Sequence, residues 1–98
     1  MKSHSEPAGL DHRESADGYS GIVCRLNDRW RVIVCKDALQ WILQRRDGER
    51  RGRARWTGES YHRRRDALIR VCRTKAGEID PAAAAILEGL SGTMGGAS

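Results

Sequence analysis

The chain has 98 residues, with 18 Lys or Arg against 13 Asp or Glu, and its formal net charge is +5 at pH 7. This length leaves no room for more than one domain. No apolar stretch approaches the length of a membrane span, and no apolar run follows Met1 and Lys2 as it would in a signal peptide. We therefore expect a cytoplasmic location, no membrane partner, and three cysteines that remain reduced thiols.

Both ends of the chain are poor in residues that form a core. Residues 1–18 have Leu10 as their only large aliphatic residue, and residues 89–98 read GLSGTMGGAS. We expect both ends to be flexible and a single small α+β domain to occupy residues 19–88. A core of this size is marginal, although the three Trp residues help it because each buries a large area.

A β-hairpin is predicted at the start of this domain. The runs GIVCRL and RWRVIVC are rich in β-forming residues, and Asn27-Asp28 between them tolerate the backbone of a tight turn. Strand alternation gives the second run two faces, with Trp30, Val32 and Val34 on one and Arg31, Ile33 and Cys35 on the other.

Two further strands are predicted next. The run LQWILQRR, residues 39–46, alternates between two faces, with Trp41, Leu43 and Arg45 on one and Ile42, Gln44 and Arg46 on the other. Asp47-Gly48 indicates a turn, and the run from 49 to 52 has no core residue and is expected to be an exposed loop. The run RARW, residues 53–56, is expected to form a last short strand with Ala54 and Trp56 facing inward.

Two helices are predicted after the strands. Ala67, Leu68, Val71 and Cys72 form one apolar stripe at helical spacing, with Ser60 expected as the N-cap and Gly77 after the last turn. Asp80-Pro81 begins a second helix, PAAAAILE, which ends at Gly89. Its anchors are expected to be Ile79, Ile86 and Leu87. The sequence leaves open whether this second helix packs on the sheet or against another chain.

The predicted architecture is therefore α+β: a three- to four-stranded antiparallel sheet with one helix packed on one face and a short C-terminal helix. The other face of the sheet is expected to be open and rich in Arg. Such a face is either plain solvated surface or a binding surface.

The strongest functional signal is a block of positive charge. Residues 44–65 contain nine Arg against Asp47, Glu49 and Glu59, a sum of +6. Arg presents a planar fork that fits phosphate and guanine, and it stacks on bases. A GC-rich genome also favours Arg codons, which explains the preference for Arg over Lys better than it explains the clustering. A solvated run of charge is the alternative to a binding site.

Eleven residues are predicted to contact a nucleic acid. Phosphate binding requires several cations on one surface, and an aromatic ring can stack on a base. Trp30 and Trp41 are assigned to the core, Tyr61 is expected to anchor the helix to the sheet, and Trp56 is left open between stacking and anchoring. The predicted contacts are Arg31, Arg45, Arg46, Arg50, Arg51, Arg53, Arg55, Trp56, Arg63, Arg64 and Arg65. The last three lie at a helix start, where the helix dipole disfavours cations, and this suggests a function for them.

The sequence contains no recognisable catalytic motif, so no enzyme activity and no cofactor are predicted. His62 lies among arginines at a helix start, which disfavours its charged form, and it is expected to be a solvated residue or a neutral phosphate contact. The spacing of Cys24, Cys35, His62 and Cys72 fits no familiar zinc pattern, so no metal site is predicted.

Two stretches resemble known DNA-binding domains. YSGIVCRLNDRW is similar to the first hairpin of AP2-type DNA-binding domains, and RARWTGESYHRRRDAL is similar to the last strand and helix of that family. The arm-binding domains of phage-type integrases have the same layout. The resemblance implies a three-stranded sheet and one helix, with the open sheet face in the DNA major groove. It implies contacts from Arg25, Arg29, Arg31, Trp30, Arg53, Arg55 and Trp56.

This resemblance has departures. Tyr61 stands five residues after Trp56, where the family usually has four, and LQWILQRR has no counterpart in the family. The central run WRVIVCKDALQWILQRR is instead similar to small proteins of GC-rich proteobacteria, some of them from mobile elements, and this second resemblance implies no activity.

Two functional hypotheses follow from the sequence. The first is a non-enzymatic nucleic-acid-binding module, with DNA favoured over RNA, that uses an Arg-rich sheet face and loop. The second is an inhibitor or adaptor, encoded by a mobile element, that docks its basic patch on an acidic protein surface. The oligomeric state is not predicted.

Overall fold

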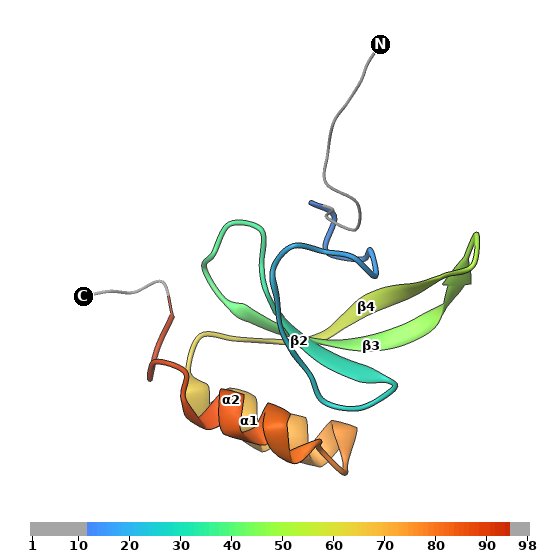
Figure 1. Ribbon diagram of the computed structural model, residues 1–98. Helices are drawn as coiled ribbons and strands as arrows, with labels where there is room; N and C mark the ends of the chain where they lie inside the picture. The colour runs from blue at the N-terminus through green and yellow to red at the C-terminus, as the bar shows by residue number, and fades with distance from the viewer. Residues whose placement is uncertain (1–11, 95–98) are drawn as a thin grey trace.

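The structure is a computed structural model, and it describes residues 12–94. The elements in chain order are β1 (Ile22–Arg25), β2 (Trp30–Val34), β3 (Trp41–Arg50), β4 (Arg53–His62), α1 (Arg65–Ala76) and α2 (Pro81–Glu88). The strands form one antiparallel sheet in the order β1-β2-β3-β4, with both helices below it in Figure 1. This confirms the predicted α+β fold.

One face of the sheet carries the main core. Both helices pack there, α1 against β3 and β4 and α2 against β1. Leu68 and Cys72 of α1 are fully buried, as their helical spacing predicts. The other buried members of this core are Cys24, Leu26, Val32, Trp41, Leu43, Ala83 and Leu87. The predicted alternation of β2 and β3 is confirmed, because Val32, Trp41 and Leu43 face the helices while Ile33 and Ile42 belong to a second cluster on the opposite face.

The second helix packs on the sheet of its own chain. Asp80 caps α2, since its carboxylate accepts a hydrogen bond from the N–H of Ala82 at 3.1 Å, and Pro81 occupies the first turn as predicted. Ala83 and Leu87, four residues apart, form the buried stripe, so Ile86 is 45% exposed. The expectation that Ile86 anchors this helix was therefore wrong.

The strands β3 and β4 are longer than predicted. Asp47-Gly48 does not form the predicted turn, because both residues lie within β3. The pairing of β3 with β4 is irregular between Arg46 and Glu49, and Gly48 there has a φ of 106°. The chain reverses instead at Arg51 and Gly52, whose φ values of 53° and 78° suit the tight turn of a two-residue hairpin. The expected N-cap, Ser60, also lies within β4, because this strand pairs with β3 as far as His62. Arg64 holds the N-cap position of α1, and its side chain does not cap the backbone N–H groups of the helix.

The folded part of the chain is wider than 19–88. Residues 13–18, which we call the strap, lie against the sheet, where Ala16 pairs with Arg55. Near the other end, Arg65 N–H donates to Gly92 and Met94 N–H donates to Arg63. The expected flexibility of residues 1–11 and 95–98 concerns positions outside the described residues. Within residues 12–94, no helix has both the length and the apolar character that crossing a membrane requires.

Asn27 joins the first hairpin to the end of α1. Its Oδ1 accepts hydrogen bonds from the N–H groups of Arg29 at 2.9 Å and Trp30 at 3.0 Å. Its Nδ2 donates to the carbonyls of Ala76 at 3.1 Å and Glu78 at 2.9 Å. One side chain therefore forms the predicted turn and also holds the segment between the helices.

Replacement of Asn27 by Ala removes these four hydrogen bonds. We expect Asn27→Ala to lower the free energy of unfolding by about 2–3 kcal/mol, because four hydrogen bonds are lost and two of them are partly buried. Urea denaturation followed by circular dichroism measures the change. Asp28→Ala, at the adjacent exposed turn position, is the control and should change stability by less than about 0.5 kcal/mol. Equal effects of the two substitutions would show that the Asn27 side chain does not hold the turn.

All three cysteines are buried and free. Burial raises the pKa of Cys24 to about 11 and the pKa of Cys72 to about 12, above the ordinary thiol value of 9.0. Between pH 9 and the folded pKa values, both thiols therefore stay protonated in the folded protein, whereas the same thiols ionise in the unfolded chain. The stabilisation linked to these thiols is complete below pH 9 and is lost as the pH rises towards the folded values.

The free energy of unfolding should consequently fall by about 2 kcal/mol between pH 9 and pH 10, with the two thiols contributing equally. Urea denaturation at both pH values measures this fall. Cys72→Ala lacks one titrating thiol and should lose about half as much over the same interval. A variant that loses as much as the wild type would show that Cys72 does not contribute.

Candidate nucleic-acid interface

The face of the sheet opposite the helices is covered, not open as predicted. Tyr19, Ile33, Cys35 and Ile42 form a small buried cluster on it. The remaining buried side chains of this face are those of Arg31 at 0% exposure, Gln44 at 2% and Trp56 at 4%. The strap provides the cover, so the face that the sequence suggested as a binding surface is largely interior.

Arg31 makes more hydrogen bonds to the strap than any other described residue, and Gln44 Nε2 adds one to the Glu14 carbonyl at 2.9 Å. Arg31 Nε donates to Gln44 Oε1 at 2.7 Å. Its two terminal nitrogens donate to three strap carbonyls, those of Glu14 at 3.0 Å, Ala16 at 2.8 Å and Asp17 at 3.1 Å. The guanidinium also lies over the ring of Trp56, 4.4 Å from its centroid, in a cation–π contact. Sequence reasoning missed the strap, because its role depends on main-chain carbonyls that no side-chain pattern reveals.

Among residues 12–94, no carboxylate is bound to Arg31. All four of its hydrogen-bond acceptors are neutral carbonyl or amide oxygens. The pKa of Arg31 is lowered from 12.5 to about 10, chiefly by burial and in smaller part by the nearby Arg25, whereas Asp17 acts in the opposite direction. The side chain is therefore still a cation at neutral pH, and its positive charge is held inside the molecule.

The strap also closes part of the free edge of β4. The N–H of Trp56 donates to the Ser15 carbonyl at 3.0 Å, and Trp56 Nε1 donates to the Asp17 carboxylate, also at 3.0 Å. Asp17 lies 3.8 Å from Arg25 as well. Trp56 is thus fixed by stacking and by two hydrogen bonds. Because Arg31 and Trp56 are both buried, they do not belong to an exposed contact surface, although the sequence placed them in one.

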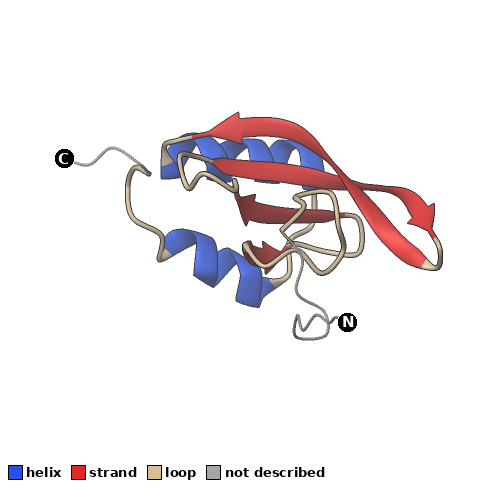
Figure 2. Cartoon of the chain, turned by 90° about the horizontal axis from the view of Figure 1, so that it is seen from above, coloured by secondary structure: helices blue, strands red, loops and turns tan. Residues whose placement is uncertain are grey.

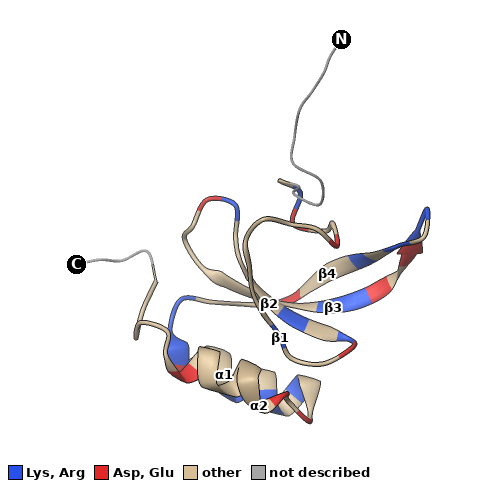
Figure 3. Cartoon of the chain, in the orientation of Figure 1, with Lys and Arg blue, Asp and Glu red and all other residues tan. Residues whose placement is uncertain are grey.

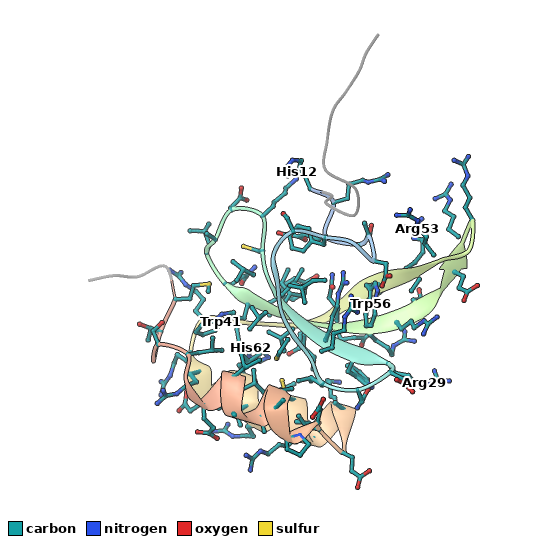
Figure 4. All side chains as sticks on the ribbon, in the orientation of Figure 1. His12, Arg29, Trp41, Arg53, Trp56 and His62 are labelled. Carbon is teal, nitrogen blue, oxygen red and sulfur yellow. The ribbon has the colours of Figure 1, made fainter. Side chains whose placement is uncertain are left out.

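The exposed positive charge gathers at the end of the β3–β4 hairpin. This hairpin projects beyond the rest of the sheet in Figure 1, and Figure 2 shows its two strands as a twisted ribbon that extends away from the helices. In Figure 3 the acidic and basic segments alternate along β3, and the turn between the two strands is basic. Arg53 points away from the ribbon near its end, with Trp56 closer to the body of the protein (Figure 4).

Four of these arginines lack an acidic partner. Within residues 12–94, no ion pair forms at Arg50, Arg51, Arg53 or Arg55, which we call the tip arginines. The first three are exposed and Arg55 is half-buried. Arg45 differs, because it is paired with Glu59 at 3.1 Å and with Asp47 at 3.8 Å. Arg46 is paired with Glu49 at 3.3 Å.

A hollow of about 470 Å³ lies between the strap and this hairpin. The tip arginines and Arg13 line it, together with Asp17 and Gly18 of the strap. Asp17 is therefore the only acid among the described residues that line it. A neighbouring hollow of about 480 Å³ shares Arg53, Asp17 and Gly18 but is less positive, since Arg25 and Arg46 are balanced there in part by Asp28.

The three arginines near the start of α1 lie apart from the tip. They stand beyond the opposite end of β4, a ten-residue strand that spans about 30 Å. Arg64 is paired with Asp66 at 2.9 Å. Arg65 donates to the carbonyls of Leu90 at 2.8 Å and Glu88 at 3.3 Å, near the C-terminal end of α2.

This contact gives a structural reason for a placement that seemed unfavourable, because a cation stabilises the C-terminal end of a helix. Arg63 is exposed, and its carbonyl accepts a hydrogen bond from Met94 N–H. The structure therefore does not bring Arg63, Arg64 and Arg65 onto one surface with the tip arginines.

The remaining aromatic residues and His62 also have defined places. Trp41 is buried and Trp30 is half-buried against the main core, as predicted. Tyr61 is 55% exposed, so it does not serve as the expected anchor. His62 pairs across the sheet with Trp41 (Figure 4), and its Nε2 is hydrogen-bonded to Ser60 Oγ. Burial lowers the pKa of His62, so its charged form is disfavoured as predicted, although the cause is burial at the end of β4 and not a position at a helix start.

Comparison of the chain with protein-family models, with curated proteins and with solved structures gave no match.

Proposed function

We propose that the protein is a small non-enzymatic module that binds duplex DNA with the projecting end of its β3–β4 hairpin. The observation that supports this proposal most strongly is the set of four tip arginines, which have no acidic partner in the described part of the chain. Arg50 ends β3 and Arg51 lies in the turn, whereas Arg53 and Arg55 lie on β4. An unneutralised cluster of this kind attracts a polyanion, and each phosphate it neutralises releases counterions.

The shape of the hairpin favours duplex DNA over other polyanions. The major groove of B-form DNA admits a two-stranded β-ribbon, and arginine there binds the guanine edge with two hydrogen bonds. The corresponding groove of double-stranded RNA is deep and too narrow for side chains to read. The ribbon formed by β3 and β4 projects from the body of the protein and so can enter a groove without a clash from the helices (Figure 2).

The roles of the arginines follow from their positions. Arg50 and Arg51 lie at the turn, the end of the hairpin that would enter the groove farthest, and are suited to contact either base edges or phosphates there. Arg53 and Arg55 lie on β4 beside the strap and are suited to contact the phosphate backbone. Arg45 and Arg46, which are already paired with acids, are expected to contribute less.

A titration with three ligands tests the partner class. A fluorescently labelled 20-base-pair duplex, the same sequence as a single strand, and poly-glutamate as a competitor are compared by fluorescence anisotropy at 50 mM salt. We expect the duplex to bind more tightly than the single strand and to resist displacement by an equal charge concentration of poly-glutamate. Preference for the single strand would contradict the duplex assignment. Displacement by poly-glutamate at equal charge would instead favour an acidic protein partner.

A further inference from the structure

The hollow between the strap and the hairpin has three features that point to an anion. It is lined by five arginines and one acid, and the four tip arginines among them have no acidic partner within the described residues. Asp17, the single acid, is already engaged by Trp56 Nε1 and lies near Arg25. Among residues 12–94, little negative charge is therefore left to balance the four tip arginines in the wall of the hollow.

The second feature is the buried cation beneath the strap. Arg31 keeps its charge at neutral pH and binds only neutral oxygens. The electrostatic potential of a buried charge without a carboxylate partner extends farther than that of an exposed charge, because less solvent screens it. The carbonyls of Glu14, Ala16 and Asp17 point towards this cation, so the strap separates it from the hollow.

The third feature is a pair of main-chain donors in the strap. The N–H groups of Asp17 and Gly18 have no acceptor among residues 12–94, whereas the N–H of Tyr19 donates to the Ala16 carbonyl. Both residues border the hollow. Consecutive main-chain N–H groups in a turn are a common cradle for one anionic oxygen.

We propose that this hollow binds a phosphate group, held by the N–H groups of Asp17 and Gly18 and by the guanidinium groups of Arg53 and Arg55. The phosphate is a diester of the DNA backbone, an identification that rests on the proposed function. The site fixes the backbone of one strand beside the ribbon, while the turn reaches into the groove. Arg31 contributes charge to the site without contacting the ligand.

Nuclear magnetic resonance of the ¹⁵N-labelled full chain tests this site with two probes, a 20-base-pair duplex and inorganic phosphate. With each probe we expect saturable shifts of the Asp17 and Gly18 amide signals and no shift of the Gly77 amide, at the end of α1. The double variant Arg53→Gln/Arg55→Gln should lose the response to phosphate. Arg70→Gln/Arg73→Gln, which removes the same charge from α1, should keep it.

The outcomes separate the two proposals. Duplex binding that leaves the Asp17 and Gly18 amides unmoved overturns the phosphate site and leaves DNA binding standing. A response to inorganic phosphate without any duplex binding shows a site for a free phosphate and overturns its assignment to DNA. No response to either probe overturns both proposals, and a phosphate response that survives in the Arg53/Arg55 variant overturns the role of those two side chains.

Discussion

Replacing Arg31 with Met is expected to lower the free energy of unfolding by about 4 kcal/mol or more. The substitution keeps the bulk of an unbranched side chain but removes every donor. Gln44 Oε1 and the Asp17 carbonyl then lose their only donor among the described residues, in a site where Arg31 is fully buried. The Glu14 and Ala16 carbonyls each lose one of two donors, because Gln44 Nε2 still donates to the first and Tyr19 N–H to the second. The stacking of the guanidinium on Trp56 is lost as well. A domain of this length has only about 5–15 kcal/mol of stability, so the loss is a large part of the total.

Urea denaturation followed by tryptophan fluorescence measures this effect. Trp56 is buried beneath the strap, so detachment of the strap should shift the emission to longer wavelength even where the sheet persists. Arg29→Met is the matched control, because Arg29 is exposed on the same hairpin and its substitution removes the same charge. A loss of less than about 1 kcal/mol in Arg31→Met would show that the strap is not held by this side chain.

The double variant Arg53→Gln/Arg55→Gln is expected to bind duplex DNA roughly 50-fold more weakly at 0.1 M salt. Each phosphate contact contributes about 0.9 to the slope of log K against log salt, so two lost contacts flatten the slope by about 1.8. The stability of the protein should change little, since Arg53 is exposed and neither residue has an ion pair within the described chain. Anisotropy titrations at several salt concentrations give both the affinity and the slope.

The control for this experiment is Arg70→Gln/Arg73→Gln, with both residues exposed on α1. It removes the same net charge from the far side of the molecule and should weaken binding less than about threefold through long-range electrostatics alone. If the two double variants lose affinity equally, binding depends on overall charge and the hairpin has no special role.

The sequence predicted the fold well wherever one local pattern decided the outcome. Strand alternation placed Val32, Leu43 and Ile33 on their correct faces, and the Asp80-Pro81 signal marked the start of α2. The errors arose where tertiary pairing overrode a local signal. Asp47-Gly48 is a typical turn sequence, but pairing of β3 with β4 continues past it as a bulge and ends at Arg51 and Gly52. The same pairing kept Ser60 within β4.

The candidate site could be predicted only in part. The concentration of arginine between residues 45 and 55 is visible in the sequence, and Arg50, Arg51 and Arg53 are indeed exposed. The sequence could not show that Arg31 and Trp56 are interior, because their burial depends on a polar strap that has no hydrophobic pattern of its own. The sequence also could not show that Arg65 lies away from the tip arginines and binds the end of α2, because the carbonyls that it contacts lie more than twenty residues later in the chain.

The salt dependence of duplex binding by the wild-type protein tests the central claim most directly. The four tip arginines, which have no acidic partner among residues 12–94, predict about four phosphate contacts at most. The slope of log K against log salt should therefore be about −3 to −4 between 50 and 200 mM. A slope in that range, lowered by the Arg53/Arg55 substitutions, would support DNA binding through the tip arginines. No detectable binding at 50 mM, or an affinity that does not change with salt, would contradict it.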